Sequence, residues 1–288
     1  MNYAHGFHAG NFADVFKHVF LTRALVYLLK KPAPLRFIDT HAGAGAYDLD
    51  DEAGRRSPEW RDGIARLLKA KPPAEIAELL KPYLDAVGPF DPDTGRPQSY
   101  PGSPAIAQYL LRADDKIALC EANVREYERL MVALGRDRRL RISSADGYLS
   151  LNAYLPPVER RGLVLIDPPY EQPEEAARVE SALGKALAKW PRGVYMTWRP
   201  IKSGLEDAHF LNAIRALGAP NVLGLELDVG PVAPGPHSPA PLRRIGLLIV
   251  NPPFGLAEEA RVLMPYLTKL LTRGGQGEFV VDWVTAPL

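Results

Sequence analysis

Short apolar runs alternate with helical stretches along most of this chain, and this alternation limits the folds open to it. Several runs are apolar throughout, which is typical of strands buried on both faces of a sheet. Strands that are joined by helical crossovers run parallel to one another. The predicted strands span 35–40, 116–122, 140–146, 162–168, 193–198, 222–229, 245–251 and 278–284. The pattern predicts an α/β fold, with a mostly parallel sheet covered by helices on both faces.

One gap breaks the alternation. The segment 47–98 contains no strand pattern, and two amphipathic pieces, 60–70 and 74–87, occupy part of it. Because a structureless loop of this length is rare in a compact domain, we predict a small helical insertion after the first strand. The catalytic domain then consists of residues 1–46 and 99–288, with 47–98 as the inserted subdomain. The alternative is an excursion that only serves the structure.

Composition limits the functions open to the chain. Its 288 residues carry a net charge of +1, which argues against a module that only binds nucleic acid. A single cysteine excludes an intramolecular disulfide and a thiolate zinc site. No apolar run approaches the length of a membrane span, and the N-terminus lacks a signal-peptide pattern, so we expect a cytoplasmic protein without membrane association. Histidines gather near the N-terminus, but without metal-ligand spacing, so we expect no metal.

The first chemical motif is the segment 37–45, in which an apolar strand runs into Asp39 and a turn that contains Gly43 and Gly45. Glycines at such a turn let the backbone approach a ligand closely. The dinucleotide pattern G-x-G-x-x-G is not completed, because Asp48 occupies the position of the third glycine. The motif suits S-adenosylmethionine (SAM) better than a dinucleotide, and an ordinary tight turn is the alternative.

Acidic residues follow three later strands, at Glu121, Asp146 and Asp167. Ligands of open α/β sheets bind at the carboxyl ends of the strands. Glu121 is suited to accept hydrogen bonds from two ribose hydroxyls, and Asp146 with Gly147 to meet the amino group and a ring nitrogen of an adenine. For each acid taken alone, capping of the next helix is the alternative.

The most specific motif is Asp167-Pro168-Pro169-Tyr170, at the end of the fourth strand. It matches the [DNS]-P-P-[YFW] pattern of enzymes that methylate exocyclic or amide nitrogens. The Asp167 carboxylate and the Pro168 carbonyl can accept hydrogen bonds from an amine and so free its lone pair for a methyl group. Tyr170 offers a ring for an extruded base. The similar segment 251–254, Asn-Pro-Pro-Phe, is predicted to be a structural turn near the far edge of the sheet.

The segment 12–29 has apolar residues at helical spacing, and Asn11 is a plausible N-cap. Lys17 and His18 lie near one another on this predicted helix. They could reach the carboxylate end of SAM or substrate phosphates, and an ordinary solvent-facing role is the alternative.

Other features are less specific. Ser103 is predicted to cap a helix over 105–111, with Pro104 in its first turn. The basic cluster at 136–141 and the arginine pair at 160–161 are candidate phosphate contacts or simply solvated surface.

The ordered strings FHAGNFADVFKH, DTHAGAG, YPGSP, ADG, LIDPPYE and NPPF resemble the RlmJ family, bacterial methyltransferases of adenine N6 in large-subunit ribosomal RNA. The resemblance runs from Tyr3 to the VDWV string near the C-terminus. It implies a class I methyltransferase fold of the Rossmann-like type, SAM as methyl donor with S-adenosylhomocysteine as product, and one adenine of 23S rRNA as substrate.

The resemblance also implies roles for individual residues. Together with the glycine turn, it gives as cofactor contacts His18, His41, Gly43, Ser103, Glu121, Asp146, Gly147 and Asp167. It makes Asp167 the catalytic acceptor, with Pro168 and Tyr170 in the same motif. Tyr3, Lys17 and Tyr170 are expected on the substrate side.

We expect the partner to be 23S rRNA in a protein-free or early-assembly form, and the enzyme to be a monomer. One alternative is a DNA adenine-N6 methyltransferase, because D-P-P-Y does not distinguish the two nucleic acids; no separate DNA-recognition domain is evident. Another is a catalytically silent RNA-binding factor of ribosome assembly, which an intact D-P-P-Y disfavours. With a net charge of +1, RNA affinity must come from local patches and substrate shape.

Overall fold

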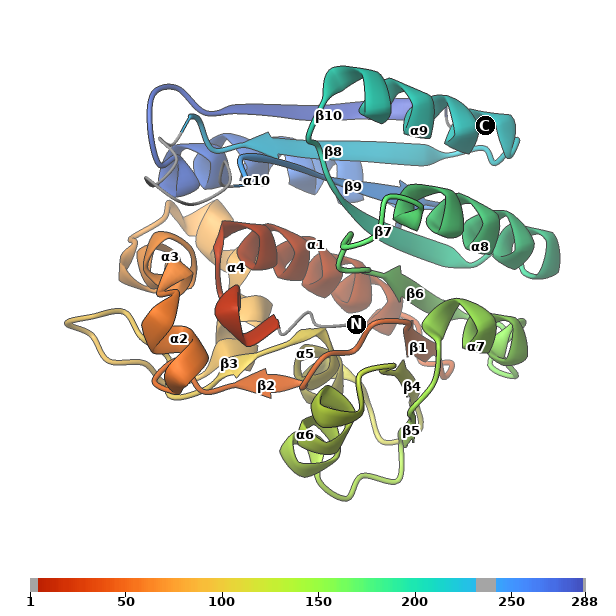
Figure 1. Cartoon of the computed structure of the whole chain (residues 1–288), viewed down its shortest axis with the longest axis horizontal. Coiled ribbons are helices and arrows are strands. Elements are labelled where there is room, and N and C mark those ends of the chain that lie inside the picture. The colour runs from red at the N-terminus through yellow and green to blue at the C-terminus, as the bar shows by residue number, and fades with distance from the viewer. Residues whose placement is uncertain (1–4, 232–241, 287–288) are drawn as a thin grey trace.

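A sheet of eight strands forms the centre of the computed structural model, which describes residues 5–231 and 242–286 (Figure 1). The strands lie in the order β10-β8-β9-β7-β6-β1-β4-β5. Their bounds are β1 Arg36–Asp39, β4 Lys116–Cys120, β5 Leu140–Ser143, β6 Gly162–Ile166, β7 Val194–Pro200, β8 Val222–Asp228, β9 Arg244–Val250 and β10 Glu278–Thr285. Each strand predicted from the sequence is present.

The direction of the strands places a crevice at the middle of the sheet. Strands β5, β4, β1, β6 and β7 pair in parallel, whereas β9 is antiparallel to both β7 and β8, and β10 is antiparallel to β8. The chain begins at β1, moves outward to β4 and β5, and then returns to β6 on the other side of β1. Ligands of open α/β sheets bind where the strand order reverses in this way, at the carboxyl ends of the strands. The predicted Rossmann-like fold of class I methyltransferases is confirmed.

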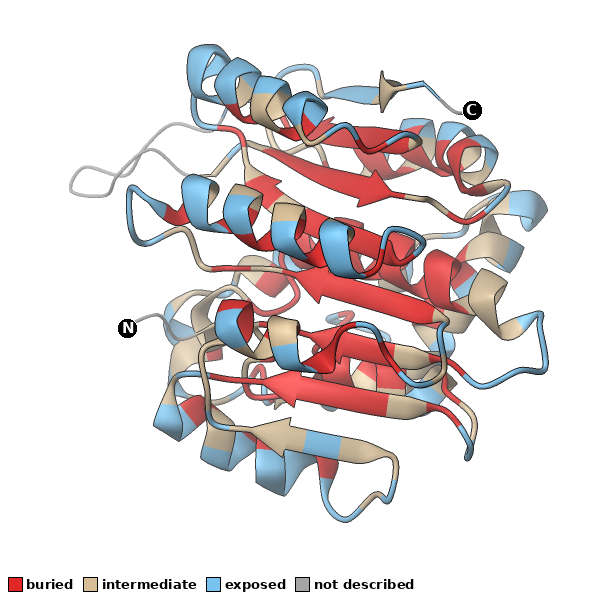
Figure 2. Ribbon diagram, turned by 90° about the vertical axis from the view of Figure 1, so that its right-hand side faces the viewer, coloured by how far each residue is buried: buried red, intermediate tan, exposed pale blue. Residues whose placement is uncertain are grey.

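Alternate residues of the central strands point into two hydrophobic clusters, one on each face of the sheet. Phe37 and Leu163 belong to the first cluster, and their chain neighbours Ile38 and Val164 belong to the second. The first face is covered by α1 Phe12–Leu29, α5 Ser103–Leu110, α6 Val124–Leu134 and α10 Leu256–Leu271, and the second by α7 Gly147–Tyr154, α8 Glu175–Lys189 and α9 Gly204–Ala216. Figure 2 shows the buried strands between helices whose outer sides are exposed.

Helix α1 is buried around most of its circumference. Every residue from Phe12 to Leu25 is buried, the polar ones included. The side chain of Asn11 accepts hydrogen bonds from the amides of Ala13 and Asp14, at 2.9 and 3.0 Å, so the predicted N-cap is confirmed. Because buried charged side chains are costly without partners, Asp14, Lys17 and Arg23 need partners inside the protein. No helix in the described part of the chain is long and apolar enough to span a membrane.

The segment after β1 contains the predicted helices. Between the paired strands β2 Ala46–Tyr47 and β3 Tyr100–Pro101 lie α2 Glu52–Arg56, the 3-10 helix η2 Glu59–Asp62, α3 Ile64–Lys69 and α4 Ala74–Val87, and a further 3-10 helix, η1 His5–Phe7, precedes α1. The side chains of Ile64, Leu80 and Tyr83 belong to the same buried cluster as α1. The inserted helices therefore share their core with the sheet, and the division at 47–98 remains our proposal.

The segment Asn251-Pro252-Pro253-Phe254 follows β9, and its predicted position is wrong. Strand β9 lies beside β7, not near the far edge of the sheet, and it runs antiparallel to β6. Asn251 therefore leaves the sheet at the end opposite to Asp167. Its side chain donates hydrogen bonds to the carbonyls of Pro191 and Gly193, at 2.9 and 2.8 Å, and its φ is 51°. These contacts agree with the prediction of a structural turn.

We expect Asn251→Ala to lower the free energy of unfolding by about 2 kcal/mol, because it removes two hydrogen bonds and places an alanine in a left-handed conformation. Urea denaturation measures this loss. Asn251→Gly serves as the control: it accepts the backbone conformation but lacks the hydrogen bonds, so it should lose less. Equal stability of all three proteins would contradict the structural role of Asn251.

Candidate functional site

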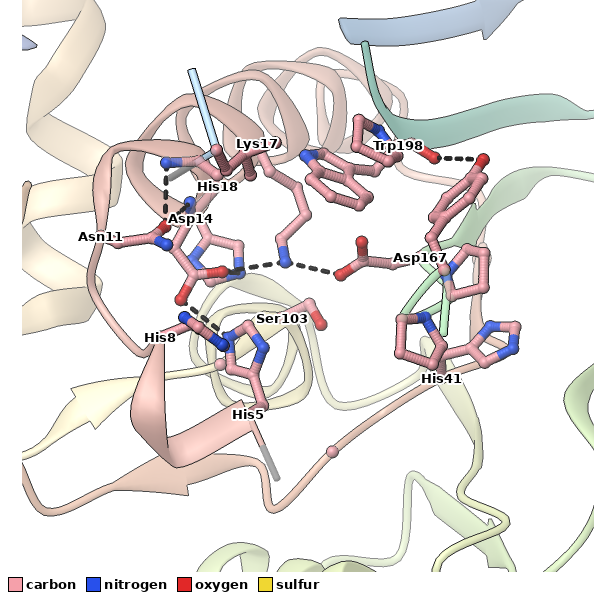
Figure 3. A pocket seen from close by; sticks show the side chains of 18 of the residues that line it. His5, His8, Asn11, Asp14, Lys17, His18, His41, Ser103, Asp167 and Trp198 are labelled. Carbon is pink, nitrogen blue, oxygen red and sulfur yellow. Dashed lines mark hydrogen bonds and ion pairs between the residues drawn. The ribbon is translucent and has the colours of Figure 1, made fainter. Parts of the chain in front are cut away.

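A cavity of about 500 Å³ opens at the carboxyl ends of β1, β4 and β6, between these strands and the N-terminal half of α1 (Figure 3). Its size lies within the range of small-molecule sites. The predicted site residues that line it are Lys17, His18, His41, Gly43, Ser103, Glu121, Asp167, Pro168 and Tyr170. Segments that are far apart in the sequence thus meet in one cavity, as the strand-end positions of the motifs predicted.

Three charged side chains form a chain across one wall. The ammonium of Lys17 lies 2.5 Å from Oδ2 of Asp167 and 2.9 Å from Oδ1 of Asp14 (Figure 3). The second oxygen of Asp14 accepts hydrogen bonds from the ring of His5, at 2.9 Å, and from the amide of Gly10, at 3.0 Å. Lys17 thereby connects helix α1 to the strand-end motif that follows β6.

Burial and pairing oppose each other in this cluster. Burial alone would lower the pKa of Lys17, but Asp14 and Asp167 raise it above its usual range. Burial would raise the pKa of Asp14, but the nearby His5 and Lys17 hold it well below its usual range. Pairing therefore prevails, and Lys17 and Asp14 are charged at neutral pH. The alternative of a solvent-facing Lys17 is wrong, because the residue is 5% exposed.

Two histidines of the cavity are neutral. Burial lowers the pKa of His18 to about 3 and that of His41 to about 4. Nδ1 of His18 lies 2.8 Å from the hydroxyl of Tyr100, and Nδ1 of His41 lies 2.8 Å from that of Thr40. The ring of His41 also meets Tyr148 edge-on, with centroids 4.9 Å apart. Neutral rings can donate or accept a hydrogen bond but place no charge beside a ligand.

The turn after β1 is fixed by carboxylates. Asp39 accepts hydrogen bonds from the hydroxyl of Ser103, at 2.7 Å, and from the amide of His41, at 3.1 Å. Burial raises the pKa of Asp39 to about 7. Gly43, at φ +60°, donates its amide to Oε2 of Glu121 at 2.8 Å. Burial raises the pKa of Glu121 as well, although it also accepts the amide of Asn123, at 2.7 Å. A carboxylate that binds the turn thus faces the cavity.

Ser103 does not cap α5 as predicted. The N-cap is Gly102, and Ser103 is the first helical residue, with Pro104 next to it as expected. The hydroxyl of Ser103 is turned to Asp39 instead. The hydroxyl donates to this buried carboxylate at the end of β1 and does not cap the helix amides, and this long-range contact has no local signal in the sequence.

Asp146 and Gly147 lie beside the cavity but not among the residues that line it. Oδ1 of Asp146 caps α7 by accepting the amides of Tyr148 and Leu149, at 2.8 and 3.1 Å, and Oδ2 pairs with Arg178 at 2.7 Å. The capping alternative is therefore realised, and a cofactor contact of Asp146 remains a prediction. A Cβ on Gly147 would lie 1.9 Å from the carbonyl oxygen of Thr40, so only glycine fits there. Tyr3 lies outside the described residues.

The sequence motifs did not point to Asp14. It stands three and four residues before Lys17 and His18, which puts all three on one side of a helix. An acid at this spacing from a lysine and a histidine was the available signal. Trp198 was also missed: its carbonyl accepts the hydroxyl of Tyr170, at 3.2 Å, and the two rings meet at 66°.

One arginine of each basic cluster makes contacts within the fold. Arg139 donates to the carbonyls of Gln108, at 2.8 Å, and Leu111, and it pairs with Asp137 at 2.6 Å. Arg161 donates to backbone carbonyls of 28 and 33. These two side chains are therefore occupied within the fold, and a phosphate contact by the exposed Arg136, Arg138 or Arg141 remains a prediction. In the described part of the chain, no three His, Cys, Asp or Glu side chains are grouped to hold a metal ion.

Comparisons with known proteins agree with this geometry. Residues 32–285 match the family model described as "Ribosomal RNA large subunit methyltransferase D, RlmJ". Proteins named ribosomal RNA large subunit methyltransferase J are similar over 99% of both chains: that of Escherichia coli K12 is 36% identical, and that of Haemophilus influenzae Rd is 33% identical. The crystal structure of protein LPL1258 from Legionella pneumophila is 33% identical, with a TM-score of 0.84 over 96% of this chain and 98% of that one.

Replacing Lys17 with methionine leaves buried Asp14 without its cation. We expect Lys17→Met to lower the free energy of unfolding by about 3 kcal/mol. The double variant with Asp14→Asn should lose less than the sum of the single losses, since the two residues interact directly. Urea denaturation tests both expectations. Lys81→Met, which breaks the exposed pair with Asp85, should have no measurable effect. Additive losses at 14 and 17 would rule out the interaction.

The ring resonances of His18 and His41 should show no titration midpoint between pH 8 and pH 5, because their pKa values lie near 3 and 4. His8 should titrate above its ordinary value, since the hydrogen bond to Glu59 raises its pKa. Histidine NMR titration, with signals assigned through single His→Gln variants, measures these values. A midpoint above pH 6 for either ring would show that it is hydrated or paired with a carboxylate.

Proposed function

The chain belongs to the RlmJ family of ribosomal RNA large subunit methyltransferases, and we propose that it methylates the exocyclic N6 of one adenine in 23S rRNA. The observation that carries this proposal is the position of Asp167 and Pro168. They lie at the carboxyl end of β6, in the same cavity as the residues expected to hold the methyl donor.

SAM is the methyl donor, and when bound it supplies a methyl group on an activated sulfonium. The residues present fit such a ligand. Glu121 offers a buried carboxylate to a ribose diol, and its backbone contacts with Gly43 and Asn123 fix its direction. The neutral rings of His18 and His41 offer hydrogen bonds without adding positive charge near the sulfonium.

Further contacts extend the proposed cofactor site. Ser103 lies on the cavity wall and remains a proposed contact, together with Asp167. For Asp146 and Gly147 the proposal rests on their place at the start of α7, next to His41 through Tyr148.

The target amine is oriented by Asp167 and Pro168. An adenine N6 is a poor nucleophile because its lone pair is delocalised into the ring. Lys17 holds one oxygen of Asp167, Oδ2, and no described residue donates to Oδ1. Oδ1 and the carbonyl of Pro168 can therefore accept the two N6 hydrogens. This arrangement turns the lone pair out of conjugation and gives the departing proton an acceptor.

Tyr170 and Trp198 form the wall against which the base is expected to pack. The hydroxyl of Tyr170 donates to the carbonyl of Trp198 at 3.2 Å, which fixes the direction of its ring. Tyr170 has a φ of 50°, an uncommon conformation that turns its side chain at the end of the motif. Both residues line the cavity. An extruded adenine stacked on such rings matches the way enzymes hold flipped bases.

We further propose that the enzyme acts as a monomer in the cytoplasm, on 23S rRNA that is protein-free or at an early stage of assembly. Tyr3 is proposed on the substrate side from the family resemblance alone.

The reaction is tested by incubating the protein with labelled SAM and unmethylated, protein-free 23S rRNA. The modified nucleotide is then mapped in the product. A single modified adenine is the expected result. Equal transfer to random-sequence DNA would support a DNA methyltransferase, and no transfer to RNA would support a silent binding factor.

Asp167→Ala should reduce methyl transfer by at least about 10²-fold, because the amine loses its acceptor and its orientation. The affinity for SAM, measured by calorimetry, should change only slightly. Asn251→Ala is the matched control: it alters the second x-Pro-Pro motif, at the opposite end of the sheet, and should retain activity in its folded fraction. A large loss of SAM affinity in Asp167→Ala would instead show that its cofactor contact, and not the orientation of the amine, is its main role.

A further inference from the structure

A second cavity, of about 290 Å³, opens beside the first. It lies between the loop after β6, the end of β7 and the N-terminal turns of α8 and α9. Tyr170, Pro200 and Lys202 line both cavities and form the wall between them. The second cavity therefore begins where the expected position of the target base ends.

The lining of the second cavity suits a planar, partly polar group. Ile201 and Phe210 are buried and give it an apolar floor, and Ser203 and Gln172 stand exposed at its rim. Its volume lies just below the usual range for small-molecule sites, which fits one nucleoside and not a larger cofactor.

The charges around the second cavity are mostly compensated. Asp207 pairs with the buried Arg199, and Arg199 also pairs with Glu226 at 2.8 Å. Glu206 remains exposed at the rim, where its carboxylate can accept a hydrogen bond from a base amino group. Asp207, neutralised by Arg199, therefore adds little repulsion toward a polyanion that passes above the floor.

Lys202 is the cation between the two cavities. It is exposed, and within the described residues it forms no ion pair or hydrogen bond. An ammonium at this place can contact the phosphate that joins two nucleotides whose bases lie on either side of Tyr170.

We propose that the second cavity receives the nucleoside adjacent to the target adenosine in single-stranded RNA, with Lys202 at the linking phosphate. This inference rests on the proposed function, because it takes the target adenine to lie in the first cavity. Sequence-specific RNA recognition acts mainly on splayed bases of single strands, and stacking of one base contributes strongly to affinity. The second cavity would therefore position the strand and add to the selection of the target site.

Short oligonucleotides test the proposal. Calorimetry, with S-adenosylhomocysteine present, measures the affinity of the protein for adenosine monophosphate. It also measures the affinity for two dinucleotides, in which the same adenosine is extended by one nucleotide on its 5′ or its 3′ side. In the unmodified protein, extension on one side should raise the affinity about tenfold. The readout is the gain in affinity, defined as the affinity for the extended dinucleotide divided by the affinity for adenosine monophosphate.

Two variants act on the second cavity in different ways. Ala176→Trp fills it from the first turn of α8, and Lys202→Ala removes the ammonium. In each, the gain should fall below about twofold. Lys185→Ala, on the exposed side of α8 and away from both cavities, is the charge-matched control and should keep the full gain. Circular dichroism checks folding, and Ser203→Trp replaces Ala176→Trp if the latter does not fold.

The proposal is overturned if neither extension raises the affinity, or if the gain survives in both variants. Its failure is distinct from failure of the proposed function. Suppose that the unmodified protein methylates 23S rRNA but the variants of the second cavity keep the full gain in affinity. The proposed reaction would then stand, and only the proposed second nucleoside site would be refuted.

Discussion

The pairing of Lys17 with two carboxylates is the constraint on which the site depends. Helix α1 is buried along most of its length, so a charged side chain in it is stable only with partners inside the protein. Asp14 provides one partner from the same helix, and Asp167 provides the other from the end of β6. The ion pair between Lys17 and Asp167 therefore stabilises the buried lysine of α1 and also holds the carboxylate that we propose to orient the amine.

Much of the architecture could be predicted because it is encoded locally. The apolar runs predict the strands, and helical spacing with an N-cap at Asn11 predicts α1 over Phe12–Leu29, as observed. The positions of Glu121 and Asp167 at strand ends placed both in one cavity, because parallel strands end at the same edge of a sheet. Local patterns do not encode strand direction between distant segments. This is why β9, which lies beside β7 and runs antiparallel to it, could not be predicted.

Individual contacts of the site depend on the packed fold. Ser103 has the sequence context of an N-cap, yet its hydroxyl meets Asp39, which lies 64 residues earlier in the chain. Asp146 has the context of a ligand contact, and its carboxylate is shared between helix amides and Arg178. The Ser103 hydroxyl is used by the distant partner alone, whereas Asp146 keeps its local cap with Oδ1 and binds Arg178 with Oδ2. Only the assembled sheet brings these distant partners within reach.

Several of the positive charges of the protein are paired inside the fold. Arg139, Arg161 and Arg199 direct their guanidinium groups to carbonyls or carboxylates within the fold. Such cations stabilise the protein but contribute little to a field that attracts a polyanion. Positive charge that remains available, such as that of Lys202, then has an effect that depends on its position more than on its quantity.

Helix α1 comes early in the chain, but its partners come late. Arg23 forms a two-pronged pair with Glu259, at 2.7 and 2.8 Å, across 236 residues of sequence, and Lys17 reaches Asp167 across 150. During synthesis, Lys17 and Arg23 of this helix therefore lack their distant carboxylate partners until most of the chain has been made. Contacts of such long range make folding slow and cooperative, and they favour a late, concerted assembly. A ribosome that is still synthesising this protein thus presents no finished site until Asp167 has been added and can meet Lys17.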